Sequence, residues 1–154
     1  MKRGVYYAAA AALVAADQIT KIAARASLPG QGTVPLIPGV VGLTYVENTG
    51  MAFSSLSSFT GVLAVVSFAA AVALAYAVWK DPMKHPFCQW MFTLLLAGAV
   101  GNLIDRALLG FVTDMIQLLF VTFAVFNVAD ICVTVGAMGL MVYVLLFEGR
   151  EDRG

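Results

Sequence analysis

The sequence carries very little charge. Of its 154 residues, nine are lysine or arginine and nine are aspartate or glutamate, so the formal net charge is zero. In soluble domains about a quarter of the residues are charged, whereas here the share is 12%. The chain therefore does not resemble a soluble domain. It also lacks the basic surface that binding to nucleic acid requires.

Cysteine and histidine are scarce as well. The cysteines, Cys88 and Cys132, lie far apart in apolar runs, which predicts small buried side chains and no disulfide framework. The single histidine, His85, precedes a proline and is expected in a solvated loop. The sequence shows no metal-ligand set, no phosphate-binding loop and no serine-nucleophile motif. We therefore expect neither a metal nor a cofactor.

Apolar residues, in contrast, make up 61% of the chain. A membrane-spanning helix needs about 20 largely apolar residues, and four segments meet this requirement. They run from about Val5 to Arg25, from Phe59 to Trp79, from Phe87 to about Ile104, and from Val128 to Phe147. Backbone groups in lipid must bond within their own segment, so each is expected to be a helix. We predict an integral membrane protein, mainly α-helical, with residues 1–154 forming one domain.

Basic residues predict the orientation of the spans. With four spans, three groups of them share one side: Lys2 and Arg3, Lys80 and Lys84, and Arg150 and Arg153. An excess of lysine and arginine marks the cytoplasmic side. Both termini are thus expected in the cytoplasm, with segments of about 27–58 and 106–126 outside. The start of the chain resembles a signal peptide, but its apolar pattern continues through Ile22, so we expect the first span to be retained.

The two outer segments differ in character. Residues 27–58 begin with a loop rich in glycine and proline. They continue into VGLTYVENTGMAF, where β-branched and aromatic residues predict short strands in a small outer platform. Residues 107–125 are apolar enough for a fifth span, but no turn separates them from the fourth. A fifth span would also move Arg150 and Arg153 outside, so we expect a re-entrant segment along the outer membrane surface.

Ionisable residues within or at the edge of a span are costly and are candidates for function. In the first span, Asp17 and Lys21 are four residues apart, which predicts a salt bridge on one helix face. In the third span, spacing places Gly98, Asn102 and Asp105 on one face. Gly98 would also allow another helix to approach closely. In the outer segment, ENTG at 47–50 predicts a turn.

The fourth span opens with two polar residues. Asn127 suits a helix N-cap, whereas Asp130 lies too far along to be the cap itself, so we infer another role for it. Asp105, Asp114 and Asp130 are all expected near the outer ends of the third and fourth spans. Two neighbouring carboxylates share a proton, and then one can act as a base on water while the other acts as an acid. The sequence therefore predicts carboxylate chemistry at the membrane edge.

Asp105 competes with Asp114 as the partner of Asp130. Asp105 is next to Arg106, and a salt bridge between them would lower its pKa and prevent proton sharing. Asp114 has no basic residue within several positions, so we favour Asp114.

Two other function classes remain open at this point. A small proton-coupled transporter or channel would line a path with acids near the bilayer midplane. Here the acids gather on one side, and the second span has none. A noncatalytic membrane scaffold would tolerate the loss of Asp130.

Five motifs follow one another along the chain: DQITK, ENTGMAF, AGAVGNLIDR, FVTDMI and FNVAD. In this combination the sequence closely resembles the lipoprotein signal peptidases, the signal peptidase II family of bacterial aspartyl peptidases, over nearly its whole length. The resemblance implies a four-helix enzyme of the bacterial cytoplasmic (inner) membrane with an outward-facing site. It implies cleavage of prolipoproteins just before a cysteine that carries a diacylglyceryl group. It also implies contact with membrane lipid, inhibition by globomycin-like cyclic peptides, and no metal or cofactor. We expect a monomer.

The resemblance also assigns residues. Asp114 and Asp130 match the aspartates of the family's VVDF and N-x-A-D motifs, which form its catalytic pair. The family's supporting polar residues match Asp17, Lys21, Asn48, Gly50, Asn102, Asp105, Arg106 and Asn127. Of these, Asn48 and Arg106 are expected to hold substrate carbonyls, and Asn127 to orient Asp130.

The chain departs from the family's usual pattern near the acids. Met51 replaces an alanine of NTGAAF, AGAVGN at 97–102 stands for GGALGN, and VTDM at 112–115 stands for VVDF. None of these changes removes a catalytic group, but they leave the shape of the pocket open.

Overall fold

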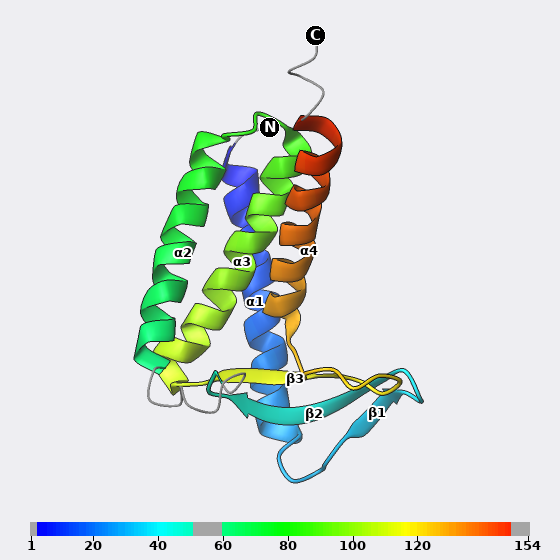
Figure 1. Cartoon of the computed structure of the whole chain (residues 1–154). Helices are drawn as coiled ribbons and strands as arrows, with labels where there is room; N and C mark the ends of the chain where they lie inside the picture. The colour runs from blue at the N-terminus through cyan, green and yellow to red at the C-terminus, as the bar shows by residue number, and fades with distance from the viewer. Residues whose placement is uncertain (1–2, 51–59, 149–154) are drawn as a thin grey trace.

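The computed structural model describes residues 3–50 and 60–148. In this part of the chain, four helices run side by side and a small sheet lies across one end of them (Figure 1). The helices are α1 (Arg3–Ser27), α2 (Thr60–Lys80), α3 (Pro86–Leu109) and α4 (Val128–Tyr143), which a π-helical turn continues as η2 (Val144–Glu148). The strands are β1 (Val34–Ile37), β2 (Val41–Asn48) and β3 (Val112–Leu118).

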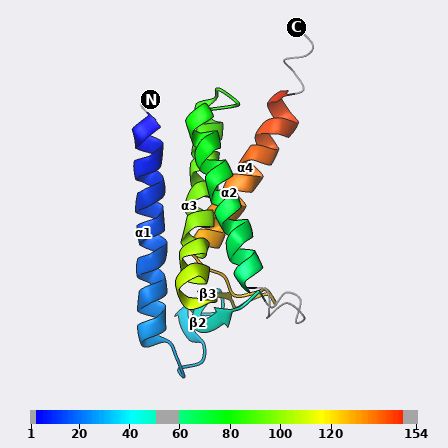
Figure 2. The ribbon, with the colours of Figure 1, turned by 90° about the vertical axis from the view of Figure 1, so that its left-hand side faces the viewer.

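Some residues used in the sequence predictions lie outside the described part: Lys2, Met51, Phe59, Arg150 and Arg153. The start of α1 and the end of η2 lie at the same end of the bundle, away from the sheet (Figures 1 and 2). The loop between α2 and α3 lies at the same end. Of the predicted basic groups, the described residues Arg3, Lys80 and Lys84 lie at this end.

Three of the expected spans are helices that are long and apolar enough to cross a membrane. In the described residues these are Gly61–Lys80, Pro86–Leu109 and Val128–Phe147. The first expected span forms the helix α1, but α1 is not one of the helices that are long and apolar enough to cross a membrane. It carries Asp17 and Lys21, which lower its hydropathy although both side chains are buried against other helices. Crossing of the membrane by α1 therefore stays a prediction.

The sheet confirms the predicted strands and adds a third strand that the sequence did not predict. Strands β1 and β2 form in residues 27–58, as expected, and pair in antiparallel fashion. Residues 107–125 were expected to form a re-entrant segment along the outer membrane surface, with no secondary structure assigned to it. Residues 107–109 complete α3, and residues 112–118 form β3, which pairs with β2 from Val41↔Leu118 to Asn48↔Val112. The strand satisfies its backbone by this pairing and by bonds between Ile116 and Phe126.

Local signals set the ends of α3. The His85 side chain accepts the Phe87 N–H at 3.3 Å and caps the helix, with Pro86 at its first position. His85 is exposed, as predicted, but its capping role was not foreseen. Gly110, at φ +80°, ends the helix by donating its N–H to the Arg106 carbonyl. The helix thus stops just before β3, which places Asp114 beside the bundle.

Helix α3 packs against each of the other three helices. Glycines allow close contact with α4: a methyl group at Gly98 would overlap the Ala129 carbonyl, and one at Gly136 would lie 2.8 Å from the Met91 carbonyl. A methyl at Gly101 would lie 2.7 Å from the Asp17 carboxylate. The prediction of a close helix contact at Gly98 is therefore confirmed. The small side chains bring the polar faces of α1, α3 and α4 together.

Candidate functional site

Asp114 lies in the middle of β3, opposite Val46 of β2, and is 1% exposed. Two amides hold its carboxylate. Asn48 Nδ2 donates to Oδ2 at 2.9 Å, and Asn127 Nδ2 donates to Oδ1 at 2.7 Å. Strand β3, the end of β2 and the start of α4 thus meet at the Asp114 carboxylate.

Asp130 is the third residue of α4 and is partly buried. Asn102 Nδ2 donates to its Oδ1 at 2.7 Å, and the Asn127 backbone N–H donates to its Oδ2 at 3.2 Å. Asn127 Oδ1 in turn accepts the Asp130 N–H at 2.9 Å, which completes a capping box. Asn127 is thus the N-cap, as predicted, and Asp130 completes the box from the third position without being the cap itself. The box holds the carboxylate at the helix start, close to Asn102.

Asn127 contacts both aspartates. Its side-chain amide donates to Asp114, and its backbone N–H donates to Asp130. The expectation that Asn127 orients Asp130 agrees with this geometry. The same residue also holds the second acid, which the sequence did not predict.

The surroundings of Asp114 raise its pKa to about 6. Burial is the main cause, because it disfavours the charged form. The hydrogen bond from Asn48 lowers the pKa, the charge of Asp130 raises it, and Asn127 and Lys21 lower it. A carboxyl with this pKa exchanges its proton near neutral pH, as a general acid or base must.

Asp105 has a different environment from Asp114. Its Oδ2 accepts the Thr113 backbone N–H at 2.8 Å, and its carboxylate lies 3.5 Å from Lys21 Nζ and 3.8 Å from Arg25 Nη1. The expected salt bridge therefore exists, but its basic partners come from α1 and not from Arg106. Asp105 anchors the start of β3 to the bundle and is held by the two basic side chains of α1.

Arg106 points toward α2, where its Nη1 donates to Ser67 Oγ at 3.4 Å. It is partly buried and interacts electrostatically with Asp114, Asp130 and Asp105. The structure thus places a cation within electrostatic reach of the two candidate acids.

The predicted salt bridge in α1 is confirmed. Lys21 Nζ lies 2.9 Å from Asp17 Oδ2, and both side chains are buried. Lys21 also donates to Asn102 Oδ1 at 2.9 Å, and Asp17 Oδ1 accepts the Ala129 N–H of α4 at 2.9 Å. The pair therefore connects α1 to the residues around Asp130, a larger role than orienting one helix.

The turn expected at ENTG, residues 47–50, is present. Asn48 Oδ1 accepts the Gly50 N–H at 2.9 Å, and Gly50 has φ +89°, a conformation that favours glycine. The turn fixes the Asn48 side chain so that its amide nitrogen reaches Asp114.

The sequence interpretation missed Gln18, Arg25 and Thr113. Gln18 Nε2 contacts Asp17, Asp105 and the Gly101 carbonyl at 3.0–3.3 Å. Arg25 Nη1 donates to Thr113 Oγ1 at 2.8 Å. An uncharged amide in an apolar helix is also costly, so Gln18 next to Asp17 was a usable signal. The contact of Arg25 with Thr113 left no such signal, because it depends on the position of β3.

A cavity of about 420 Å³ opens beside Asp130. Asn48 and Asp130 provide its polar groups together with Thr134, and the rest of its lining is apolar, including Phe123, Phe126 and Ile131. Among the described residues, no three His, Cys, Asp or Glu side chains are grouped as metal ligands. The arrangement suits a largely apolar ligand whose polar group meets Asp130 and Asn48.

Comparisons with known proteins identify the family of the chain. A family model described as signal peptidase (SPase) II matches residues 9–146. A lipoprotein signal peptidase of Clostridioides difficile is 39% identical over 139 residues, covering 90% of this chain and 93% of the relative. One of Enterococcus faecalis is 35% identical over 150 residues, covering 97% and 93%. A solved bacterial membrane enzyme superposes with a TM-score of 0.86 at 31% identity, covering 94% of each chain.

Proposed function

Because the chain belongs to the signal peptidase II family, whose members remove the signal peptides of prolipoproteins, we propose that Asp114 and Asp130 are its catalytic pair. The enzyme would be an aspartic endopeptidase that cleaves just before a diacylglyceryl-modified cysteine. The observation that carries this proposal is the position of Asn127, which donates to both carboxylates. Membership of a peptidase family speaks against the transporter, channel and scaffold alternatives.

The proposed reaction needs one proton shared between the two acids. The raised pKa of Asp114, about 6, favours this state near neutral pH. One carboxylate takes a proton from a water as that water attacks the scissile carbonyl. The protonated partner donates its proton to the developing oxyanion, and the carboxylate that took the water's proton passes that proton to the leaving nitrogen. As the C–N bond breaks, the partner takes a proton back from the hydroxyl of the intermediate, so the pair again holds one proton. No covalent acyl-enzyme forms, and the observed pKa values belong to the pair.

The supporting residues hold the acids and the substrate. Asn102 and Asn127 fix Asp130, and Asn48 and Asn127 fix Asp114. An amide nitrogen carries two hydrogens, so Asn48 can donate one to Asp114 and the other to a substrate carbonyl. Arg106 would hold a second carbonyl. The apolar cavity beside Asp130 would receive the residues next to the scissile bond.

We further propose that α1 also crosses the membrane, which would give the chain four spans. After Arg3 its large exposed side chains are apolar, with Ile19 at 66% and Ile22 at 58% exposure, whereas Asp17 and Lys21 are buried against the other helices. This distribution suits a helix with lipid on one side. The chain would then be a single-domain, monomeric enzyme of the bacterial inner membrane. Both termini would be cytoplasmic, the sheet would lie outside, and globomycin-type peptides would inhibit the enzyme.

The decisive experiment is cleavage of a diacylglyceryl-modified prolipoprotein by the purified protein in detergent. Wild type is compared with Asp114→Asn, Asp130→Asn and Asp105→Asn, each checked for thermal unfolding. We expect the first two variants to unfold like wild type and to lose cleavage. Asp105→Asn should lose stability and keep measurable cleavage per folded molecule. If Asp114→Asn cleaves while a folded Asp105→Asn does not, the catalytic pair is assigned wrongly.

A further inference from the structure

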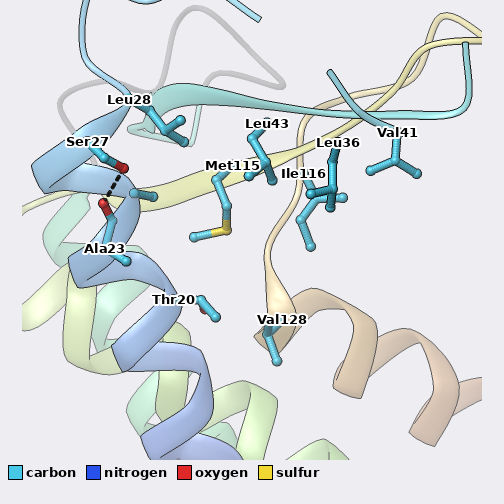
Figure 3. Close-up of a pocket in the computed structure, with 11 residues that line it drawn as sticks. Thr20, Ala23, Ser27, Leu28, Leu36, Val41, Leu43, Met115, Ile116 and Val128 are labelled. Atoms are coloured by element: carbon cyan, nitrogen blue, oxygen red, sulfur yellow. Dashed lines mark hydrogen bonds between the residues drawn. The ribbon is translucent and has the colours of Figure 1, made fainter. Parts of the chain in front are cut away.

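A second cavity, of about 340 Å³, lies between the end of α1, the sheet and the first turn of α4 (Figure 3). In the close-up, side chains from α1, all three strands and α4 surround it, among them Ala23, Leu36, Leu43, Met115 and Val128. Ligand pockets in proteins have volumes of about 300–1,000 Å³, so this cavity is large enough to hold one. Neither Asp114 nor Asp130 lines it, so it is distinct from the cavity beside Asp130.

The lining offers no free polar group. Its hydroxyls, those of Thr20 and Ser27, donate to the carbonyls of Asp17 and Ala23 at 2.8 and 2.7 Å. The other lining residues are apolar, and none is charged. A polar ligand would lose its hydration here and gain no partner. The ligand of this cavity is therefore apolar.

The cavity continues into an exposed apolar surface. Leu36 lines its edge and is 63% exposed, and Ile19 of α1, one helical turn before Ala23, is 66% exposed. In the proposed membrane arrangement this side of α1 meets the acyl chains of the bilayer. A cavity without polar partners does not hold ordered water well but does bind apolar molecules. Hydrocarbon next to its opening would fill it.

We propose that this cavity binds one acyl chain of an outer-leaflet phospholipid. The inference rests on the proposed function in one respect, the placement of α1 in the membrane, and does not depend on the catalytic pair. The bound chain contacts Met115, which follows Asp114, and Val128, which follows Asn127. The lipid therefore supports β3 and α4 at the positions that carry the two acids.

The test uses the full chain in vesicles that contain a phospholipid with a diazirine midway along one acyl chain. After irradiation, labelled residues are mapped by mass spectrometry. We expect the label on Met115, which is 3% exposed, and not on Val78, which is 0% exposed and does not line the cavity. Ala23→Phe, which fills the cavity, should reduce the Met115 label several-fold. Ile22→Phe, on a different side of α1, should leave it unchanged.

Several results would overturn the proposal. Met115 could be labelled no more than Val78, or its label could persist in Ala23→Phe. The label could also appear only when the diazirine is on the acyl chains of the prolipoprotein, which would make the substrate the occupant. Cleavage is measured in the same vesicles, so the two proposals can fail separately. A labelled Met115 without cleavage would leave the lipid site standing and contradict the proposed enzyme.

Discussion

At the scale of single residues, asparagines hold the proposed catalytic acids. Asn48, Asn102 and Asn127 each donate a side-chain or backbone N–H to one or both carboxylates. Such bonds favour the charged form and oppose the effect of burial. The balance of the two decides at which pH the pair holds one proton.

Removing the Asn48 amide should move the pH profile of cleavage in a defined direction. The hydrogen bond from Asn48 lowers the pKa of Asp114, which burial raises to about 6. Without it the pKa rises further, so Asp114 keeps its proton to higher pH and the pair stays singly protonated there. In Asn48→Ala, the alkaline limb of kcat/KM against pH should therefore shift upward, with lower activity at the optimum.

The control is Gln117→Ala, which removes an exposed amide contact with Thr33 elsewhere on the sheet. Its profile should match that of wild type. An alkaline limb in Asn48→Ala that stays in place or shifts downward would show that Asn48 does not set the titration of Asp114.

Lys21 is expected to act through Asn102. Its ammonium donates to Asn102 Oδ1, so the amide must present its nitrogen to Asp130. Lys21→Met should cost about 3–5 kcal/mol of stability, because it leaves the buried Asp17 without its partner. The double variant Asp17→Asn/Lys21→Met removes both charges and should recover much of this loss. Its kcat should nevertheless stay low, since Asn102 has lost its donor.

The measurements are thermal unfolding in detergent and single-turnover cleavage. Recovery of both stability and kcat in the double variant would mean that Lys21 has only a structural role.

At the scale of elements, close helix packing brings the polar residues together. Gly136 of α4 contacts the backbone of α3, and Gly101 of α3 contacts Asp17 of α1. Wider spacing would separate Asn102 from Asp130 and Asp17 from Ala129. The fold therefore depends on small residues at positions where the chemistry needs short distances.

Gly136→Ala should lower stability by about 1–3 kcal/mol, the usual cost of overpacking. Its added methyl would lie 2.8 Å from the Met91 carbonyl, which cannot move easily. Gly61→Ala is the matched control, because nothing lies within 4 Å of its added methyl. It should unfold at the wild-type temperature or slightly above, since alanine favours a helix. Equal unfolding temperatures for the two variants would contradict the importance of the α3–α4 contact.

At the scale of the whole molecule, the two ends of the helix bundle carry different features. The sheet and the proposed catalytic residues lie at one end, and the α2–α3 loop with Lys80 and Lys84 lies at the other (Figure 2). Positive charge favours the cytoplasmic side, so the sheet is expected to face outward. Prolipoproteins would then be cleaved at the outer surface of the membrane.

Single cysteines should reveal this orientation in intact cells. Val40→Cys, in the β1–β2 turn, should react with a membrane-impermeant maleimide added outside. Pro82→Cys, in the α2–α3 loop, should react only after the membrane is opened. The native Cys88 and Cys132 are buried, which keeps the background low. The reverse pattern would overturn the predicted topology.

The sequence by itself determined the apolar helices, the family and the candidate acids, because these depend on local composition and on motifs in fixed order. Asp17 and Lys21 could be paired from their spacing alone. The third strand could not be predicted, since residues 112–118 become a strand only when β2 lies beside them. For the same reason the partners of Asp105 were misassigned: Lys21 and Arg25 are distant in sequence and close only in the folded bundle. Tertiary structure alone decided which polar groups share a buried site, because burial makes each of them require a partner.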